Sequence, residues 1–174
     1  IPIAPSVIPS PTASWDAVLN SVLPFEPIAF EKGIQLETQI EPDIHVLGNR
    51  GQLKQLSAIL TDNACKYAAK DGTVRVSVSL TQGGKPCLKV ENTGAPIGRE
   101  ELPHIFERFY REDKARTKSA GGYGLGLSIA KAIVENHGGK ITVTSAPGEM
   151  TAFAVVFPEA SEAGERKANR KKRE

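Results

Sequence analysis

The chain has 174 residues and a net charge of +2, which is enough length for one domain with a buried core and too little charge to indicate a nucleic-acid partner. Its two cysteines, Cys65 and Cys87, lack metal-ligand spacing, which argues against a zinc site or a disulfide framework and for a reducing compartment. No apolar run is long enough to cross a membrane, and no signal peptide is evident. We therefore expect a cytoplasmic location.

Composition divides the chain into three parts. Residues 1–13 are apolar and rich in proline, and they are predicted to be a linker from a larger parent protein. Residues 14–158 carry the periodic patterns of a folded domain. Residues 159–174 are polar and charged and are predicted to be a disordered tail. Its basic run could bind nucleic acid or anionic lipid, but a solvated tail is the preferred interpretation, and we expect no nucleic-acid partner.

The first half of the folded part predicts helical structure followed by strands and a long helix. Ser14 can cap a helix whose apolar stripe includes Trp15 and Val18, and Pro24 and Pro27 interrupt this helix. Alternating apolar residues then predict two strands before helical periodicity returns. The predicted ranges are 34–40 and 44–47 for the strands and 52–69 for the long helix.

The second half predicts two hairpins separated by loops and helices. Strands at 74–80 and 87–91 flank a glycine-containing turn, and a final hairpin spans 141–157. A short helix is expected at 99–109, and the polar, glycine-rich segment 111–123 is expected to be mobile. Another helix follows this segment.

Five strands and three main helices in this order predict an α+β fold built as a two-layer sandwich. We expect a mixed five-stranded sheet with about three helices on one face. The order is not a βαβ series, and the spacing GxGxG differs from the GxGxxG of dinucleotide-binding folds. A P-loop is excluded because GxxxxGK[ST] does not occur.

The stretch from Gly121 to Gly126 holds four glycines within six positions, directly before an apolar helical pattern. Glycines there let the backbone approach a ligand closely, and the N-terminus of the next helix offers free N–H groups to an anion such as phosphate. A glycine-rich loop alone can equally be a tight turn.

A polar residue interrupts the apolar stripe of the long helix. Asn63 falls in the middle of that face, where an unpaired amide costs about 1–3 kcal/mol. A hydrogen bond to nearby backbone would explain an isolated asparagine. Lys66 and Tyr67 lie three and four residues further on, so the three side chains can line one patch suited to a magnesium-bound phosphate.

Four blocks of sequence follow one another in a fixed order: LSAILTDNACKY at 56–67, VENTGAPI at 90–97, IFERFYR at 105–111 and GYGLGL at 122–127. They resemble the N, G1, F and G2 boxes of the ATP-binding catalytic domain of sensor histidine kinases. That family belongs to the superfamily of DNA gyrase, Hsp90, histidine kinases and MutL. The resemblance covers about residues 14–157 and implies a Bergerat-type sandwich that binds ATP and Mg²⁺ beneath a lid at 110–123.

The resemblance also implies roles for individual residues. Asn63 would hold Mg²⁺, Asn92 would read the adenine amino group, and Gly94 would let the base approach. Lys66, Tyr67 and Arg111 would contact phosphate or ribose, with Asn63, Lys66 and Arg111 carrying the catalysis. The other implied ATP contacts are Ile97 and Leu127, which would sandwich the ring, together with Tyr110, Gly122, Tyr123, Gly124, Leu125 and Gly126.

Three residues depart from the family pattern. Asn92 stands where the family usually has Asp, so a neutral hydrogen bond replaces a charge-assisted one and ATP binding is expected to be several-fold weaker. Pro96 replaces the second glycine of the G1 box and stiffens the loop. Ile59 occupies a position where some members carry a second magnesium-binding Asn, which leaves metal binding to Asn63.

None of the three histidines has the sequence context of the family's phosphoacceptor. His45 and His104 are expected on a strand and on the surface, and His137 is expected to cap a helix end. The resemblance therefore implies an acceptor histidine on a helical domain of the parent, with a response regulator downstream. The parent would be membrane-anchored and homodimeric, and this fragment monomeric. The alternatives are an ATP-gated clamp and a nucleotide-binding module with weak or no kinase activity.

Overall fold

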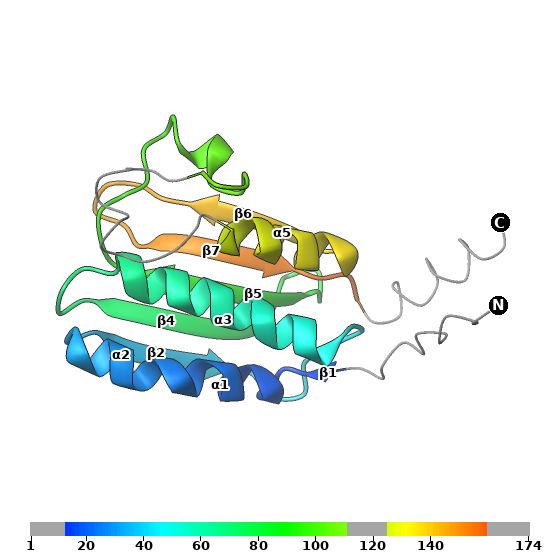
Figure 1. Ribbon diagram of the computed structural model, residues 1–174. Coiled ribbons are helices and arrows are strands. Elements are labelled where there is room, and N and C mark those ends of the chain that lie inside the picture. The colour runs from blue at the N-terminus through cyan, green and yellow to red at the C-terminus, as the bar shows by residue number, and fades with distance from the viewer. Residues whose placement is uncertain (1–12, 111–124, 160–174) are drawn as a thin grey trace, which may run out of the picture.

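The computed structural model describes residues 13–110 and 125–159 (Figure 1). The predicted linker up to residue 12, nearly all of the predicted lid and the tail from residue 160 lie outside this range. Within the described residues, no helix is both long and apolar enough to cross a membrane.

Apart from the short strand β1 and the segment 99–109, the helices and strands follow the predicted order along the chain (Figure 1). The N-terminal helical region contains α1 and α2 with a 3-10 turn at Pro24 between them, as the two prolines predicted. The helices are α1 (Asp16–Val22), α2 (Glu26–Glu31), α3 (Arg50–Tyr67) and α5 (Gly126–Asn136). The strands are β1 (Ala13–Ser14), β2 (Gln35–Ile40), β3 (His45–Val46), β4 (Thr73–Leu80), β5 (Pro86–Asn92), β6 (Lys140–Thr144) and β7 (Thr151–Val156).

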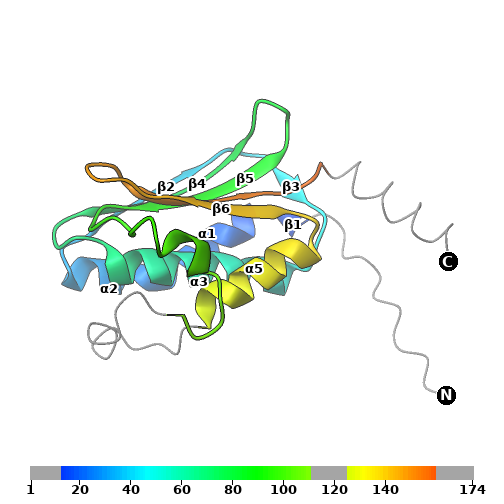
Figure 2. The same ribbon diagram turned by 90° about the horizontal axis from the view of Figure 1, so that it is seen from above.

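The main sheet has the strand order β2-β4-β5-β7-β6. The pair β2–β4 is parallel and the other three pairs are antiparallel, so the sheet is mixed, as predicted. The helices all lie on one face of this sheet (Figure 2). The predicted α+β two-layer sandwich is therefore confirmed. The short strand β3 pairs with β1 and not with the main sheet.

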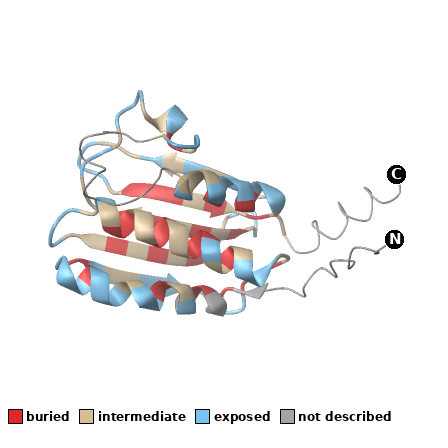
Figure 3. Cartoon of the chain, in the orientation of Figure 1, coloured by how far each residue is buried: buried red, intermediate tan, exposed pale blue. Residues whose placement is uncertain are grey.

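The core lies between the sheet and its helices, where the buried faces of both layers meet (Figure 3). Strand β4 shows why: Val74, Val76 and Val78 alternate with polar residues, so all three valines point toward the helices and are buried. The buried side chains that meet them include Leu88, Val90, Phe153 and Val155 from the sheet and Leu53, Leu56, Leu60, Ala130, Ile133 and Val134 from the helices.

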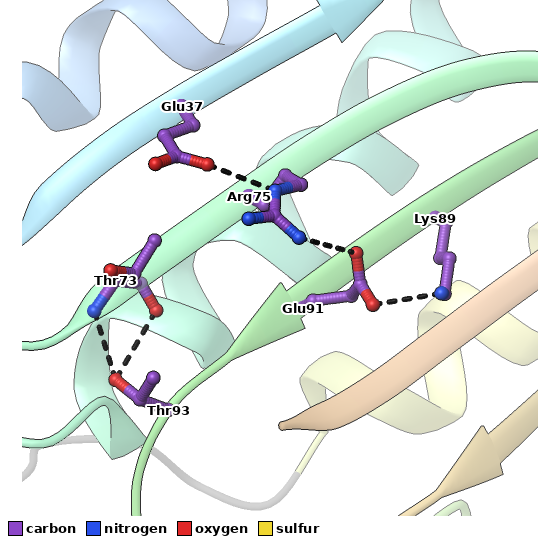
Figure 4. A network of polar contacts seen from close by, with 6 residues as sticks. All are labelled: Glu37, Thr73, Arg75, Lys89, Glu91 and Thr93. Carbon is purple, nitrogen blue, oxygen red and sulfur yellow. Dashed lines mark hydrogen bonds and ion pairs between the residues drawn. The ribbon is translucent and has the colours of Figure 1, made fainter. Parts of the chain in front are cut away.

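The outer face of the sheet is polar and carries a row of charges across three strands (Figure 4). Arg75 Nε donates to Glu37 Oε2 at 2.9 Å, and its Nη1 lies 3.8 Å from Glu91 Oε2. Lys89 Nζ lies 2.7 Å from the other oxygen of Glu91. The two pairs made by Arg75 join neighbouring strands and add to the stability of the sheet, and the Lys89–Glu91 pair lies along β5.

Two of the predicted helices differ from the structure. The predicted short helix at 99–109 is wrong: the segment forms only a 3-10 turn at Leu102–His104, and Phe109 ends it with a left-handed φ of 63°. The long helix was expected at 52–69 but begins at Arg50, because Asn49 caps it, and ends at Tyr67. The amide of Ala69 instead donates to Thr93 O at 3.0 Å, so the chain leaves the helix to join the sheet.

Both cysteines are free thiols, as predicted. Cys65 is buried in α3 and Cys87 is partly buried on β5. Burial raises the pKa of each thiol, and the neighbouring Asp62 carboxylate raises the pKa of Cys65 further. Both groups are therefore poor nucleophiles at neutral pH.

Candidate nucleotide-binding site

A cavity that is partly open to solvent lies at one end of the sandwich, and the empty space within it and at its open mouth together amounts to about 570 Å³. Five segments meet there: the end of α3, the end of β5 with the loop that follows it, the segment that ends at Tyr110, the start of α5, and the start of β7. The described residues that line the cavity are Asn63, Tyr67, Asn92, Ala95, Ile97, Ile105, Tyr110, Leu127, Thr151 and Phe153.

The last turns of α3 supply one polar wall of the cavity. Asn63 and Tyr67, one helical turn apart, both line it as predicted. Lys66 is not among the lining residues, and its Nζ pairs with Asp62 at 2.8 Å. Of the three side chains predicted to form one patch, Asn63 and Tyr67 line the cavity and Lys66 does not. No hydrogen bond among the described residues involves the Asn63 side chain, so its amide oxygen is free to bind a ligand.

Asn92 is the last residue of β5 and lies at the buried bottom of the cavity, with 3% of its surface exposed. Its Nδ2 donates to the carbonyl oxygen of Thr93 at 3.0 Å. The bond fixes the orientation of the amide and leaves Oδ1 as an acceptor. The predicted base-reading position is therefore a buried acceptor at the end of a strand.

The structure gives a reason for a glycine at Gly94 that is separate from the approach of a base, which stays a prediction. It does not line the cavity, and its φ is 143°. A Cβ at this position would collide with the carbonyl oxygen of Tyr67. Glycine is thus required because the loop after β5 passes against the end of α3, whether or not a base is bound.

The two residues expected to sandwich a ring both line the cavity. Ile97 lies on the loop after β5, and Leu127 lies in the first turn of α5. Tyr110 lines the same cavity, as predicted, and its ring lies 5.7 Å from that of His104. Apolar walls of this kind suit a flat heteroaromatic ring.

The motifs did not predict four of the lining residues: Ala95, Ile105, Thr151 and Phe153. Thr151 and Phe153 begin the inward face of β7, and Thr151 is the direct cross-strand partner of Asn92. Phe106 contacts Phe153 edge to face, with ring centroids 6.1 Å apart. Alternation along β7 could have indicated the inward face, but only the pairing of β5 with β7 brings Thr151 to the site.

The glycine-rich stretch is described from Leu125 onward. Leu125 caps α5, accepting from Ser128 Oγ at 2.8 Å, and Gly126 is the first helical residue. A Cβ on Gly126 would meet only Ile59, at an ordinary contact distance of 3.5 Å. Packing among the described residues therefore does not demand this glycine. The other predicted contacts of this part of the chain, Arg111, Gly122, Tyr123 and Gly124, lie outside the described residues.

His137 has the capping role that its position predicted. Its Nδ1 donates to Ile133 O at 2.7 Å, while its Nε2 accepts from the backbone N–H of Asn49 at 3.1 Å. The ring thereby joins the end of α5 to the beginning of α3. His45 is exposed on β3, and His104 is exposed and paired with Glu107 at 2.8 Å.

Comparison with known proteins agrees with this geometry. The family model for histidine kinase-, DNA gyrase B- and HSP90-like ATPases matches residues 48–161. The chain belongs to this ATPase family. The match includes all the described residues that line the cavity and the whole of α3, β4, β5 and α5.

Individual relatives place the chain among the catalytic ATP-binding domains of sensor histidine kinases. Sensor histidine kinase YkoH of Bacillus subtilis (strain 168) is 44% identical over 135 residues, covering 78% of this chain and 29% of that protein. The mycobacterial sensor histidine kinase MprB is similar in structure, with a TM-score of 0.73 and 30% identity over 84% of this chain and 97% of that one.

A third similar structure is full-length ShkA in complex with AMPPNP, with a TM-score of 0.73 and 26% identity over 85% of this chain and 31% of that one. The chain spans only about a quarter to a third of the length of the curated sensor kinases to which it is similar.

Proposed function

We propose that this domain binds MgATP in the cavity and transfers the γ-phosphoryl group to a histidine on a helical domain of its parent protein. The observation that carries the proposal is the buried Asn92 acceptor at the bottom of an apolar cavity whose opposite wall is the polar end of α3. A nucleotide has the same distribution: a flat base with a hydrogen-bonding edge at one end and phosphates at the other.

The base end of the cavity suits adenine. Asn92 Oδ1 can accept from the exocyclic amino group, and Ile97 and Leu127 provide apolar surface for the two faces of the ring. ShkA, which is similar in structure, was solved in complex with AMPPNP, an analogue of ATP. These features support ATP over a nucleotide with another base.

The other end of the cavity suits phosphates and a divalent cation. Asn63 has an unpaired amide oxygen of the kind that Mg²⁺ accepts beside phosphate and water. The first N–H groups of α5 would face the phosphates with the positive end of the helix dipole. Bound Mg²⁺ would offset the negative charge of the phosphates. We further propose phosphate or ribose contacts for Lys66, Tyr67, Arg111 and the glycines at 122–126.

Phosphoryl transfer requires positioning and charge neutralisation more than covalent chemistry by the protein. Asn63, Lys66 and Arg111 would supply these to the γ-phosphate, and the incoming imidazole nitrogen would be the nucleophile. We propose that this imidazole belongs to a membrane-anchored, homodimeric parent with this domain on its cytoplasmic side, and that a response regulator accepts the phosphoryl group next.

A calorimetric ATP titration of the 174-residue chain, with and without Mg²⁺, tests the binding step. We expect ATP binding that Mg²⁺ strengthens. Adding a separately produced helical hairpin of the parent should then give acid-labile phosphohistidine on the hairpin. Tight binding without transfer would instead identify a binding module, and ATP-dependent self-association in size-exclusion chromatography would identify an ATP-gated clamp. A chain that does not bind ATP would disprove the proposal.

A further inference from the structure

Two hydrogen bonds beside the cavity involve a residue that the proposed ATP contacts leave out. The backbone N–H of Ile97 donates to Ser145 Oγ at 2.9 Å, and Ser145 Oγ lies 2.7 Å from Thr151 Oγ1. Ser145 and Thr151 stand on either side of the turn between β6 and β7. Thr151 is 6% exposed and lines the cavity. Ser145 therefore connects two lining residues, Ile97 on the loop after β5 and Thr151 at the start of β7.

Either hydroxyl can donate in the second hydrogen bond, and the arrangement in which Ser145 donates satisfies the most groups. Ser145 accepts from Ile97 with one lone pair and has one proton to donate. Among the contacts of the described residues, Thr151 Oγ1 is the one acceptor within reach of that proton. If Ser145 donates to Thr151, both polar groups of Ser145 are satisfied. The proton of Thr151 is then left for a group inside the cavity.

Thr151 and Asn92 are direct cross-strand partners on β7 and β5, and both line the cavity. Asn92 presents its acceptor Oδ1, because Nδ2 is held by Thr93 O. Beside it, Thr151 presents a donor. The edge of adenine has the complementary order, with an amino donor next to the acceptor N1. A 6-oxopurine such as hypoxanthine or guanine has the reverse order, a carbonyl oxygen next to an N–H.

This pairing matters because Asn92 stands where the family usually has an aspartate. A carboxylate offers only acceptors, whereas a carboxamide can rotate and present its donor to a 6-oxopurine. A threonine hydroxyl can reverse in the same way. Selection of the base in this chain therefore depends on the groups that hold these two side chains in place, which are Thr93 O and Ser145 Oγ.

We propose that Ser145 is a positioning residue for base selection, which keeps Thr151 a donor toward the cavity and so favours adenine over a 6-oxopurine. The inference rests on the proposed binding of ATP in this cavity. It assigns a specificity role to the β6–β7 turn, which lies outside the four sequence blocks.

ATP and inosine triphosphate differ in the base edge in question, so their dissociation constants provide the test. We would titrate the 174-residue chain with each nucleotide in the presence of Mg²⁺, as wild type, Ser145→Ala and Ser145→Thr. Ser145→Ala should lower the preference for ATP about fivefold, as expected for one neutral hydrogen bond, and Ser145→Thr, which keeps the hydroxyl, should retain it. A purely structural role for Ser145 at Ile97 would weaken both nucleotides equally, so an unchanged ratio in Ser145→Ala would overturn the inference.

Thr151→Val provides a second test that does not depend on the folding of the Ser145→Ala variant. It should lower the ATP preference by a similar factor, and adding Ser145→Ala should not lower it further, because Ser145 acts through the Thr151 hydroxyl. Retention of the preference in Thr151→Val, or additive effects in the double variant, would refute the role of Ser145. A wild-type chain that binds neither nucleotide would instead reject the proposed function itself.

Discussion

The helices α3 and α5 meet at both of their ends, and the two ends are built in opposite ways. At one end the start of α3 and the end of α5 are joined through His137, which uses both ring nitrogens in hydrogen bonds. At the other end Asn63 and Tyr67 of α3 and Leu127 of α5 surround a cavity, and the amide of Asn63 has no partner among the described residues. We call these the locked end and the cavity end.

The comparison shows how one pair of helices can provide both stability and binding. Polar groups at the locked end are satisfied within the protein, so they contribute to folding and have nothing left for a ligand. At the cavity end, leaving an amide unpaired forgoes that contribution and reserves its oxygen for binding. Substitutions at the locked end should therefore change the free energy of unfolding, and substitutions at the cavity end should change nucleotide affinity.

The largest expected effect comes from Asn63→Ala at the cavity end. We expect it to abolish magnesium-dependent ATP binding, with a loss of affinity of about 100-fold or more, because the sequence offers no second asparagine at Ile59. The unfolding free energy in urea should change by less than about 0.5 kcal/mol, since no hydrogen bond is lost. Calorimetry with and without Mg²⁺ measures the first effect, and unchanged binding would remove Asn63 from the metal role.

Gly48→Ala should be the most damaging substitution at the locked end. An added Cβ would overlap the His137 ring, which cannot move aside easily because both its nitrogens are bonded. We expect a loss of about 2 kcal/mol in the urea-derived unfolding free energy and an unchanged ATP affinity. The double variant Gly48→Ala/His137→Ala is the matched control: it should be no less stable than His137→Ala alone.

His137→Ala should cost somewhat less, about 1.5 kcal/mol. The variant loses two hydrogen bonds and the edge-to-face contact with Phe157, whose ring centroid is 6.1 Å from that of His137, but water can reach the amide of Asn49. Thermal and urea unfolding measure the loss. If the variant keeps its stability but binds ATP more weakly, the locked end does not act on stability alone, as we propose.

Asn92→Asp should have the smallest effect, of about 1 kcal/mol, and it should act on both properties in opposite directions. ATP binding should tighten several-fold, because a carboxylate accepts the adenine amino group in a charge-assisted bond. Stability should fall, because Asp cannot donate to Thr93 O as the Asn92 amide does. Weaker ATP binding in this variant would argue against Asn92 as the base-reading residue.

The sequence predicted those parts of the site that lie on one continuous element. Asn63 and Tyr67 share a helix face, so periodicity and the family motif together placed them correctly at the cavity. Asn92, Ile97, Tyr110 and Leu127 were likewise found from their motifs and line the same cavity.

Two of the missed residues have a common physical cause. Thr151 and Phe153 reach the cavity only because β7 pairs with β5, and strand pairing between distant segments is not visible in local patterns. The expected helix at 99–109 failed for a related reason. Its apolar residues Ile105 and Phe106 contact the core from the residues that directly follow the 3-10 turn, so helical spacing was not needed to bury them.

The row of charges on the outer face has a consequence for how the cavity is assembled. Val74, Val76 and Val78 would still point inward if β4 and β5 slipped by two residues, so the apolar pattern alone does not choose among such pairings. In the observed pairing Arg75 lies opposite Glu91. A slip by two in one direction would set Arg75 opposite the like charge of Lys89, and a slip in the other direction would set it opposite the neutral Thr93, so the ion pair is lost in both. Charged side chains on the outer face thus favour one register of β4 against β5, the register in which Asn92 at the end of β5 lies opposite Val74.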